Sequence, residues 1–382
     1  MQKLGSALVI LAAGGTGGHI FPAEALARAL LKRGLRVALI TDRRGDKFSD
    51  DLAVPVYRIH AHKWGRGLSG KIKGLALMGI GYVQAKLLLR RLKPAAVVGF
   101  GGYPSVPTVY AASGMGIPIV LHEQNAVLGR ANRVLMAQAK LIATSFPQVA
   151  GLRGANLPRL VQTGNPVRPS FAALRSQAYP AVTPEGHLHL FVMGGSQGAR
   201  IFSAVVPQAL ALLPEPLRRR IVIAQQCRAE DIETARTGFA GAGIDAELAT
   251  FFRDVPERLA RCHLVICRAG ASTIAELTAV GRPAILVPYP FGHAQEQAAN
   301  AEALGEAGGA WIIPQEAFTP ESLAVRLEAL LTLPASLEKT AEAARAWGTI
   351  AAAENLAACV ADVIGASEPP PAHGTLAETR AA

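Results

Sequence analysis

Cysteines, charged residues and aromatic residues are scarce in this chain. Its 382 residues include four cysteines, 18% charged and 5% aromatic residues, whereas 50% are hydrophobic. Cys227, Cys262, Cys267 and Cys359 form no Cys-x-x-Cys pair, which argues against a zinc ribbon or a dithiol redox motif and is typical of a reducing cytoplasm. The length and hydrophobic content suffice for two or three domains with buried cores and exclude global disorder.

Long apolar runs are absent as well. The longest candidate, residues 74–83, is interrupted by glycines and is shorter than the about 18 residues that a membrane-spanning helix needs. The apolar run at residues 7–13 has the length of a signal-peptide core, but a glycine-rich loop follows it at once. We therefore expect no membrane span, and residues 7–13 are interpreted as a buried first strand.

Acidic residues are rare in the first part of the chain. Residues 1–169 hold 23 Lys and Arg but six Asp and Glu, a net charge of +17, whereas the remainder has a net charge of −6. This asymmetry predicts that one domain faces a polyanion, either nucleic acid or an anionic membrane, although a merely soluble basic domain is the simpler alternative. The basic part contains no recognisable nucleic-acid motif, so no nucleic-acid partner is expected.

Common metal and nucleotide motifs are missing. No Asp-x-Asp occurs, and the pair Asp50-Asp51 has no third ligand nearby in the sequence, so we expect neither a metal site nor any other obligatory cofactor. Neither a P-loop nor a Gly-x-Gly-x-x-Gly fingerprint is present. Helix N-termini and glycine loops would then have to stabilise any diphosphate leaving group.

The chain does contain alternating strand-like and helix-like segments. Strands are predicted at residues 7–13, 37–41, 96–100, 118–122 and 141–144, and again at 189–193, 221–224, 264–267 and 284–287. The pattern predicts an α/β fold of two doubly wound, Rossmann-like domains with parallel sheets that face an interdomain cleft.

The expected domains are residues 1–165 and 166–340, with a boundary near residue 165. Residues 320–365 resemble two Ala/Leu-rich helices, and the tail at 367–382 is expected to be disordered. The two halves begin alike, because residues 9–18 and 191–198 each form a strand and a glycine loop before a helix, which resembles an internal duplication.

Both glycine loops are candidate anion sites at positive helix ends, with tight structural turns as the alternative. His19 stands at the expected start of the first helix, where the helix N-terminus lowers its pKa and favours the neutral form that a general base requires. A capping or packing role for His19 is the alternative. Residues 100–107 and 122–125 follow strands at the same sheet edge, where they either bind a ligand or hold the loops together.

The second half contains a comparable arrangement. Ser272 and Thr273 begin a helix and Glu276 lies one turn later, a spacing that suits a phosphate and a ribose diol. The neutral amides between residues 295 and 300 suit sugar hydroxyls, with a solvated helix start as the alternative.

Residues 68–91 mix aliphatic and cationic side chains. Such a stretch either lies in a bilayer interface or packs as a helix on the sheet. The expected membrane contacts are Lys71, Lys73, Leu75, Leu77, Met78 and Lys86.

Taken together, an ordered set of motifs resembles one enzyme family. The segments are 14–19, 99–103, 122–125, 163–168, 194–200 and 268–276. From about residue 7 to 360, the chain closely resembles the MurG family of bacterial N-acetylglucosaminyltransferases. The resemblance implies a GT-B fold and the transfer of N-acetylglucosamine from UDP-N-acetylglucosamine to the 4-hydroxyl of the muramoyl sugar of lipid I, which yields lipid II in peptidoglycan synthesis.

The resemblance also implies roles for individual residues. Glu276 would hold the ribose, Phe251 and the Phe252 backbone the uracil, Ser196 and Arg168 the diphosphate region, and Gln297 and Asn300 the sugar. Further expected donor contacts are Thr16, Gly17, Gly18, Asn125, Gln197, Ser272 and Thr273. The expected acceptor-side residues are Gly15, Tyr103 and Asn132. Glu296 stands where family members often carry Gln or His, so its contact with the sugar is open.

The implied reaction is an inverting single displacement in which a base, His19 or alternatively Glu123, deprotonates the attacking hydroxyl. The resemblance further implies a helix at about 341–364 that crosses back to the first domain, a peripheral position at the cytoplasmic face of the inner membrane, and partners in cell-wall synthesis and division. Alternative functions are another GT-B glycolipid glycosyltransferase such as a diacylglycerol glycosyltransferase, a non-catalytic nucleotide-sugar sensor, and a dinucleotide oxidoreductase.

Overall fold

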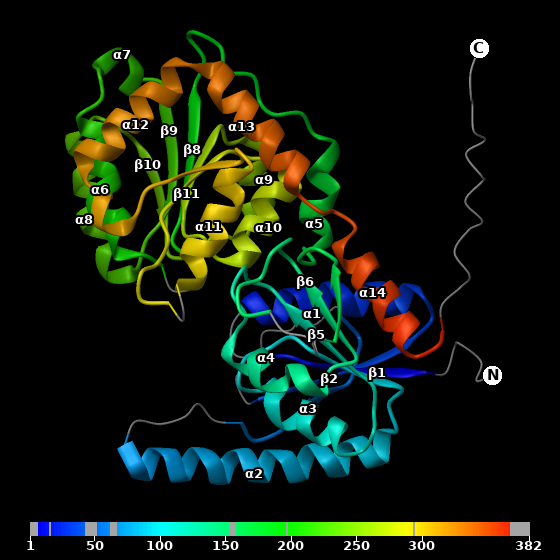
Figure 1. Cartoon of the computed structure of the whole chain (residues 1–382). Coiled ribbons are helices and arrows are strands. Elements are labelled where there is room, and N and C mark those ends of the chain that lie inside the picture. The colour runs from blue at the N-terminus through cyan, green and yellow to red at the C-terminus, as the bar shows by residue number, and fades with distance from the viewer. Residues whose placement is uncertain are drawn as a thin grey trace, which may run out of the picture.

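The computed structural model describes residues 7–14, 17–42, 52–61, 67–152, 158–195, 198–292 and 295–366, with the backbone alone for 67–73. Within these residues the chain forms two α/β domains joined by two chain crossings (Figure 1). Each domain has one parallel sheet with helices on its faces, so the expected fold class is confirmed.

The N-terminal domain is built on a seven-stranded parallel sheet of order β3-β2-β1-β4-β5-β6-β7. Its strands are β1 (Leu8–Ala12), β2 (Arg36–Thr41), β3 (Val56–Arg58), β4 (Ala96–Gly99), β5 (Ile119–Glu123), β6 (Leu141–Thr144) and β7 (Arg159–Gln162). Its helices are α1 (Gly17–Lys32), α2 (Gly67–Leu92), α3 (Ser105–Ser113) and α4 (Arg130–Leu135). Every residue of β1, β4, β5 and β6 is buried, because helices cover both faces of a parallel sheet and leave its central strands no solvated side.

The C-terminal domain has a six-stranded parallel sheet of order β10-β9-β8-β11-β12-β13. Its strands are β8 (Leu188–Met193), β9 (Ile221–Gln226), β10 (Ala246–Ala249), β11 (Leu264–Cys267), β12 (Ala284–Leu286) and β13 (Ala310–Ile312). Its helices are α5 (Pro169–Ala172), α6 (Arg200–Ala211), α7 (Glu215–Arg218), α8 (Ile232–Gly241), α9 (Val255–Arg261), α10 (Ala271–Val280) and α11 (Glu296–Glu306), followed by α12 (Pro320–Thr332) and α13 (Pro334–Trp347). The order outward from β8 repeats the order outward from β1, as expected for two copies of one fold.

The C-terminal segment differs from the expectation. Residues 320–365 form three helices rather than two, and the single helix expected at about 341–364 is wrong, because α13 ends at Trp347 and α14 (Ala352–Val363) begins after a break. Gly348 is extended there, and a Cβ at Gly348 would lie 2.5 Å from the Thr278 carbonyl oxygen. The chain therefore leaves the helix where the α13 end packs tightly on α10.

Helix α14 returns to the N-terminal domain and packs against α1 (Figure 1). Leu356, Ala357 and Val360 are fully buried in the same hydrophobic cluster as Leu26 and Leu30 of α1. The N-terminal domain is thus completed by residues from the far end of the chain.

The chain crosses between the domains at two places, near Gly164 and near Thr349, and these two crossings lie side by side. Strand β7 ends at Gln162 and β8 begins at Leu188, so the boundary expected near residue 165 falls between the two sheets. Gly164 has φ +81°, and a Cβ there would lie 2.7 Å from the Thr349 Cβ of the second crossing. This contact requires glycine at the hinge, because only glycine adopts this conformation at little cost and leaves the space open.

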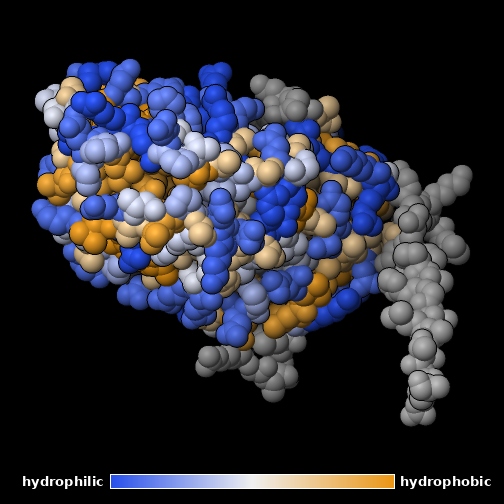
Figure 2. All heavy atoms as spheres, turned by 90° about the horizontal axis from the view of Figure 1, so that it is seen from above, coloured by the Kyte–Doolittle hydropathy of each residue, from blue (hydrophilic) through white to orange (hydrophobic). Residues whose placement is uncertain are grey.

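Helix α2 lies along the N-terminal domain on the side remote from the C-terminal domain (Figure 1). Figure 2 views the molecule from the top of Figure 1, away from α2, and shows hydrophilic side chains interspersed with hydrophobic patches. None of the described helices combines the length and apolarity needed to cross a membrane.

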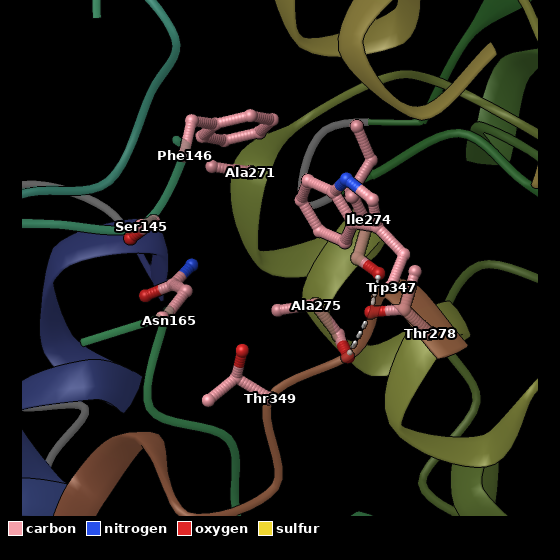
Figure 3. Close-up of a pocket in the computed structure, with 10 residues that line it drawn as sticks. Ser145, Phe146, Asn165, Ala271, Ile274, Ala275, Thr278, Trp347 and Thr349 are labelled. Carbon is pink, nitrogen blue, oxygen red and sulfur yellow. Dashed lines mark hydrogen bonds between the residues drawn. The ribbon is translucent and has the colours of Figure 1, made fainter. Parts of the chain in front are cut away.

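A small cavity of about 10 Å³ lies between the crossings and α10 (Figure 3). Asn165 points into it, and both amide atoms of its buried side chain lack a hydrogen-bond partner among the described residues. Ser145 and Thr349 also line the cavity, so the junction between the domains has a polar centre.

Candidate active site between the two domains

The carboxyl ends of β1, β4 and β5 bring the N-terminal candidates together. His19 lies in the first turn of α1, half-buried, and its Nδ1 is 3.2 Å from the Gln124 Oε1 atom that follows β5. Burial lowers the pKa of His19, while the contacts with Gln124 and the Phe100 backbone oppose this shift. Gly102, with φ +69°, faces the ring, and a Cβ there would lie 3.4 Å from His19 Nε2.

Glu123 is placed differently from His19. It is 1% exposed, and its carboxylate accepts hydrogen bonds from the Asn125 and Gly129 backbone N–H groups and from the Asn125 and Asn132 side chains, at 2.9–3.4 Å. Burial raises the pKa of Glu123, and these N–H donors oppose the rise. Both oxygens of the Glu123 carboxylate are therefore already engaged by N–H donors.

The acceptor-side candidates also hold the loops. The Tyr103 hydroxyl donates to Asp42 Oδ2 at 2.8 Å, which joins the loop after β4 to the end of β2. Asn132 is 2% exposed and donates to the His122 carbonyl oxygen and to Glu123. Asn132 therefore supports residues 122–125 from behind.

On the donor side, α10 contacts α1 of the N-terminal domain. The Ser272 hydroxyl is buried and has no hydrogen-bond partner among the described residues, and Thr273 beside it is half-buried. An unpartnered hydroxyl at a helix N-terminus suits a phosphate group, since the helix dipole and free N–H groups also favour an anion there.

Glu276 and Arg168 form an ion pair of 3.1 Å between α10 and the segment before α5. Burial raises the pKa of Glu276 to about 7, with Arg168 opposing the rise. The guanidinium of Arg168 lies 4.8 Å from the ring centroid of Phe21 and 4.7 Å from that of Phe171, so a helix of each domain contacts it. Arg168 thus stands at the domain boundary beside the candidate ribose carboxylate.

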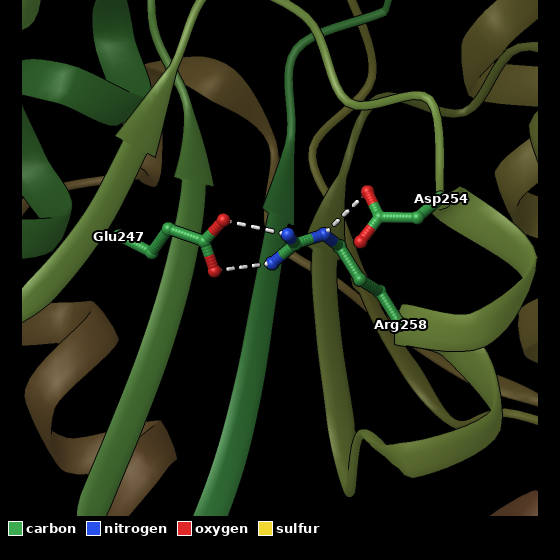
Figure 4. Close-up of polar contacts among 3 residues, drawn as sticks. All are labelled: Glu247, Asp254 and Arg258. Atoms are coloured by element: carbon green, nitrogen blue, oxygen red, sulfur yellow. Dashed lines mark hydrogen bonds and ion pairs between the residues drawn. The ribbon is translucent and has the colours of Figure 1, made fainter.

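The candidate uracil residues lie between β10 and α9. Phe251 is 68% exposed, whereas Phe252 is 7% exposed and packs edge-on against Phe191. Arg258 holds this loop through two bonds of 2.6 Å to Glu247, one of 2.9 Å to Asp254 and its position over the Phe252 ring (Figure 4). This anchoring keeps the Phe251 ring available at the surface.

The candidate sugar residues differ in how many hydrogen bonds they already make. Gln297 Oε1 accepts from the Ala269 and Tyr289 N–H groups, while its Nε2 has no hydrogen bond to a described residue. Asn300 is fully buried. Its amide joins the domains, because Oδ1 accepts from Ala126 N–H at 2.7 Å and Nδ2 donates to Asn125 Oδ1 at 3.0 Å.

Glu296, whose role the sequence leaves open, begins α11. Burial raises its pKa, and the negative charge of Glu123 raises it further. The carboxyl groups of Glu296 and Glu123, which belong to different domains, therefore interact electrostatically.

The remaining expected residues belong to the two glycine loops, which the structure describes only in part. Gly17 and Gly18 form the first turn of α1. Gly15, Thr16, Ser196 and Gln197 lie outside the described residues. Within the described ranges, no group of three or more His, Cys, Asp and Glu side chains could hold a metal ion.

The structure gives specific contacts to two residues of the segment 122–125 for which the sequence predicted no individual role. Gln124 contacts His19, and His122 contacts Gln124. The signal was present in the sequence, because residues 122 and 124 follow the period of two along β5 and therefore lie on one side of the strand end.

Comparison with known proteins gives a consistent family assignment. Residues 9–144 match the family model described as "Glycosyltransferase family 28 N-terminal domain". Residues 189–357 match the one described as "Glycosyltransferase family 28 C-terminal domain".

Similar proteins carry one name. A protein of Rhodospirillum centenum is 59% identical over 358 residues, covering 94% of each chain. One of Paramagnetospirillum magneticum is 55% identical over 359 residues, covering 94% of this chain and 97% of the relative. Both are named "UDP-N-acetylglucosamine--N-acetylmuramyl-(pentapeptide) pyrophosphoryl-undecaprenol N-acetylglucosamine transferase".

Solved structures agree in fold. The crystal structure of MurG from Acinetobacter baumannii is similar with a TM-score of 0.74 and 30% identity, covering 94% of this chain and 99% of that one. A putative UDP-N-acetylglucosamine 2-epimerase from Listeria monocytogenes has a TM-score of 0.69 at 16% identity and covers 95% of this chain and 98% of its own, which shows a shared fold alone.

Proposed function

The chain belongs to glycosyltransferase family 28, and we propose that it transfers N-acetylglucosamine from UDP-N-acetylglucosamine to the N-acetylmuramyl-pentapeptide on pyrophosphoryl-undecaprenol. It is an N-acetylglucosaminyltransferase, and this reaction is the step from lipid I to lipid II in peptidoglycan synthesis. The observation that carries the proposal is 59% identity to a relative of that name over 94% of both chains. The same likeness speaks against a diacylglycerol glycosyltransferase.

The chemistry is a single displacement with inversion at the anomeric carbon. The muramoyl 4-hydroxyl oxygen attacks this carbon while its bond to the UDP oxygen breaks, so the electron pair leaves with UDP. The hydroxyl proton passes to a base in the same step. His19 takes this role in the proposal, because it is half-buried, neutral and at the cleft, whereas Glu123 is held by four hydrogen bonds.

The C-terminal domain binds the donor and stabilises the leaving group. Phe251 offers an exposed ring face for uracil, and Glu276 accepts from the ribose hydroxyls. The N-terminus of α10 with Ser272, together with Arg168, lies where negative charge develops on the diphosphate. Gln297 has free amide hydrogens for a sugar hydroxyl.

The N-terminal domain meets an anionic membrane surface through α2. Leu75 is 62% exposed, and Ile80, Val83 and Leu87 are 48%, 54% and 59% exposed, whereas Leu77 and Met78 are half-buried. Lys86 and the exposed Arg90 and Arg91 lie beside them, while the side chains of Lys71 and Lys73 lie outside the described part. An apolar stripe flanked by cations suits a helix in the plane of an anionic interface.

A peripheral position at the cytoplasmic face of the inner membrane follows from this proposal, because the acceptor is anchored in that membrane. Association with cell-wall and division machinery is proposed on the family resemblance.

The test measures UDP release from UDP-N-acetylglucosamine with a short-chain lipid I analogue, with and without EDTA, and with diacylglycerol as the competing acceptor. Release with the lipid I analogue alone, unchanged by EDTA, is the expected result. Donor binding by calorimetry without release would contradict the proposal and leave a nucleotide-sugar sensor. Loss of release in EDTA would instead contradict metal-independent stabilisation of the leaving diphosphate.

A further inference from the structure

We propose that Gln124, itself held by His122, is a positioning residue that fixes His19 in the tautomer with its lone pair on Nε2. This inference rests on the proposed function, since the lone pair is needed only if His19 accepts the proton of the attacking hydroxyl. Three hydrogen bonds in series carry the argument. They run from the hinge residue Gly164 through His122 and Gln124 to His19.

The series begins at a group that only accepts. The Gly164 carbonyl oxygen lies 3.2 Å from His122 Nε2, so this nitrogen carries the hydrogen. The Ser145 hydroxyl, 3.4 Å from the same nitrogen, accepts as readily as it donates and is compatible with this assignment. Complete burial lowers the pKa of His122 to about 4, so the ring is neutral near pH 7 and its Nδ1 carries the lone pair.

The Gln124 amide is oriented by two acceptors. Its Nε2 lies 3.0 Å from His122 Nδ1 and 3.1 Å from the His122 carbonyl oxygen. Turning the amide over would place its oxygen against that carbonyl oxygen and against the imidazole lone pair, leaving two repulsive contacts in a buried position. The amide oxygen of Gln124 therefore faces His19.

The last bond assigns the proton on His19. Gln124 Oε1 lies 3.2 Å from His19 Nδ1, and because an amide oxygen can only accept, Nδ1 carries the hydrogen. A neutral imidazole has one hydrogen, so Nε2 holds the lone pair. An isolated amide beside His19 could turn over and favour either tautomer, and the contacts of Gln124 with His122 prevent this.

The surroundings of Nε2 suit a base. The side of the ring that bears Nε2 faces Gly102, where an added Cβ would lie 3.4 Å from this nitrogen. A hydrogen bond between the ring and the Phe100 backbone also favours the protonated form of His19. A hydrogen bond from Nε2 to that backbone would select the opposite tautomer, and the experiment below distinguishes the two.

The first measurement is the ¹⁵N spectrum of the histidine rings in the full-length protein without substrate. His19→Ala identifies the His19 signals. The expected result is one protonated nitrogen, Nδ1, and one unprotonated nitrogen, Nε2. A proton on Nε2, or an even mixture of tautomers, would overturn the proposal. Because no turnover is required, this result is independent of whether the proposed transfer reaction is correct.

The second measurement compares Gln124→Met, which removes all three hydrogen bonds of the amide at similar volume, with Gln124→Glu, which keeps an acceptor toward His19. We expect Gln124→Met to mix the tautomers and lower kcat at least about tenfold, with little change in the KM for UDP-N-acetylglucosamine. Gln124→Glu should keep the His19 tautomer and retain more of kcat. Gln225→Met, which replaces another fully buried glutamine in the other domain, is the matched control and should keep kcat.

An unchanged kcat in Gln124→Met, or equal losses in Gln124→Met and Gln124→Glu, would overturn the positioning role. Absence of transfer by the unsubstituted protein would sink the proposed function instead, while the tautomer of His19 would still be measured. The spectrum of the unsubstituted protein also keeps the proposal testable if Gln124→Met fails to fold.

Discussion

The candidate ligand-binding residues of the cleft bind one another in this conformation. Asn300 joins α11 to Asn125 and Ala126 of the other domain, and Arg168 pairs with Glu276. These contacts satisfy polar groups that would be costly to bury alone. If these residues bind the donor as proposed, donor binding exchanges these partners and is linked to the contact between the domains.

The first residue-scale prediction concerns Glu276. Burial raises its pKa to about 7, and only the ionised carboxylate accepts from both ribose hydroxyls. The affinity for UDP-N-acetylglucosamine should be highest above this pKa and should fall as the pH drops through it. Below the pKa the loss of affinity should approach about tenfold per pH unit. Calorimetry between about pH 6 and pH 8 measures this slope.

In Glu276→Gln the affinity should be lower and should not vary with pH over this range. An unaltered slope in Glu276→Gln would remove the carboxylate from the ribose site.

At the scale of elements, the position of a strand within its sheet explains whether the sequence predicts it. Every strand inside the two sheets is built around an apolar run, and each was predicted within a few residues. The unpredicted strands are β3, β7, β10 and β13, which are the edges of the two sheets. An edge strand pairs on one side only and tolerates charged residues such as Arg159 in β7 and Glu247 in β10, which interrupt the apolar pattern, whereas β13 is apolar but only three residues long.

The sequence predicted α2 as a mixed apolar and cationic segment but did not indicate which face of the helix is exposed. Ile80, Val83 and Leu87 are exposed although the sequence analysis did not single them out, because the face is determined by how α2 packs on α3 and the sheet.

Exposed apolar residues on α2 should control membrane binding. Val83→Glu with Leu87→Glu should weaken binding to vesicles containing anionic lipids at least about tenfold, because two apolar contacts are lost and two negative charges are introduced. Co-sedimentation with vesicles measures this, and turnover of a short-chain acceptor should change little.

The control is Leu212→Glu with Val325→Glu, which alters two equally exposed apolar residues of the C-terminal domain. Equal losses in the two double variants would indicate a charge effect without a role for α2.

At the scale of the whole molecule, the chain passes between the two domains twice. The first crossing passes Gly164 and the second passes Thr349, and the two are in contact. The second crossing delivers α14 to the N-terminal domain, so this domain is built from two separate segments of sequence, whereas the C-terminal domain is one continuous segment.

Leu356 should therefore stabilise the N-terminal domain. It is fully buried in the cluster that includes α1, and Leu356→Ala should lower the free energy of unfolding of this domain by about 2–5 kcal/mol. Hydrogen exchange resolved by peptide measures the effect, with loss of protection expected in β1 and α1.

Leu337→Ala is the matched control, since Leu337 is equally buried in α13 but belongs to the core of the C-terminal domain. If Leu356→Ala reduced protection in the C-terminal domain and left β1 and α1 unchanged, the assignment of α14 to the N-terminal core would be contradicted.

The sequence alone determined the features that local pattern encodes. Apolar runs predicted the inner strands, glycine loops marked the strand ends, and parallel order brought His19 and residues 122–125 to one edge. Their chemistry was recognisable because each motif is contiguous.

Only the tertiary structure decided features that depend on residues far apart in the chain. The break at Gly348 arises from the Thr278 carbonyl oxygen, the partners of Asn300 lie in the other domain, and the orientation of Gln124 depends on the Gly164 carbonyl through His122. No local pattern contains these contacts, because they form only when the two sheets and both chain crossings are packed together.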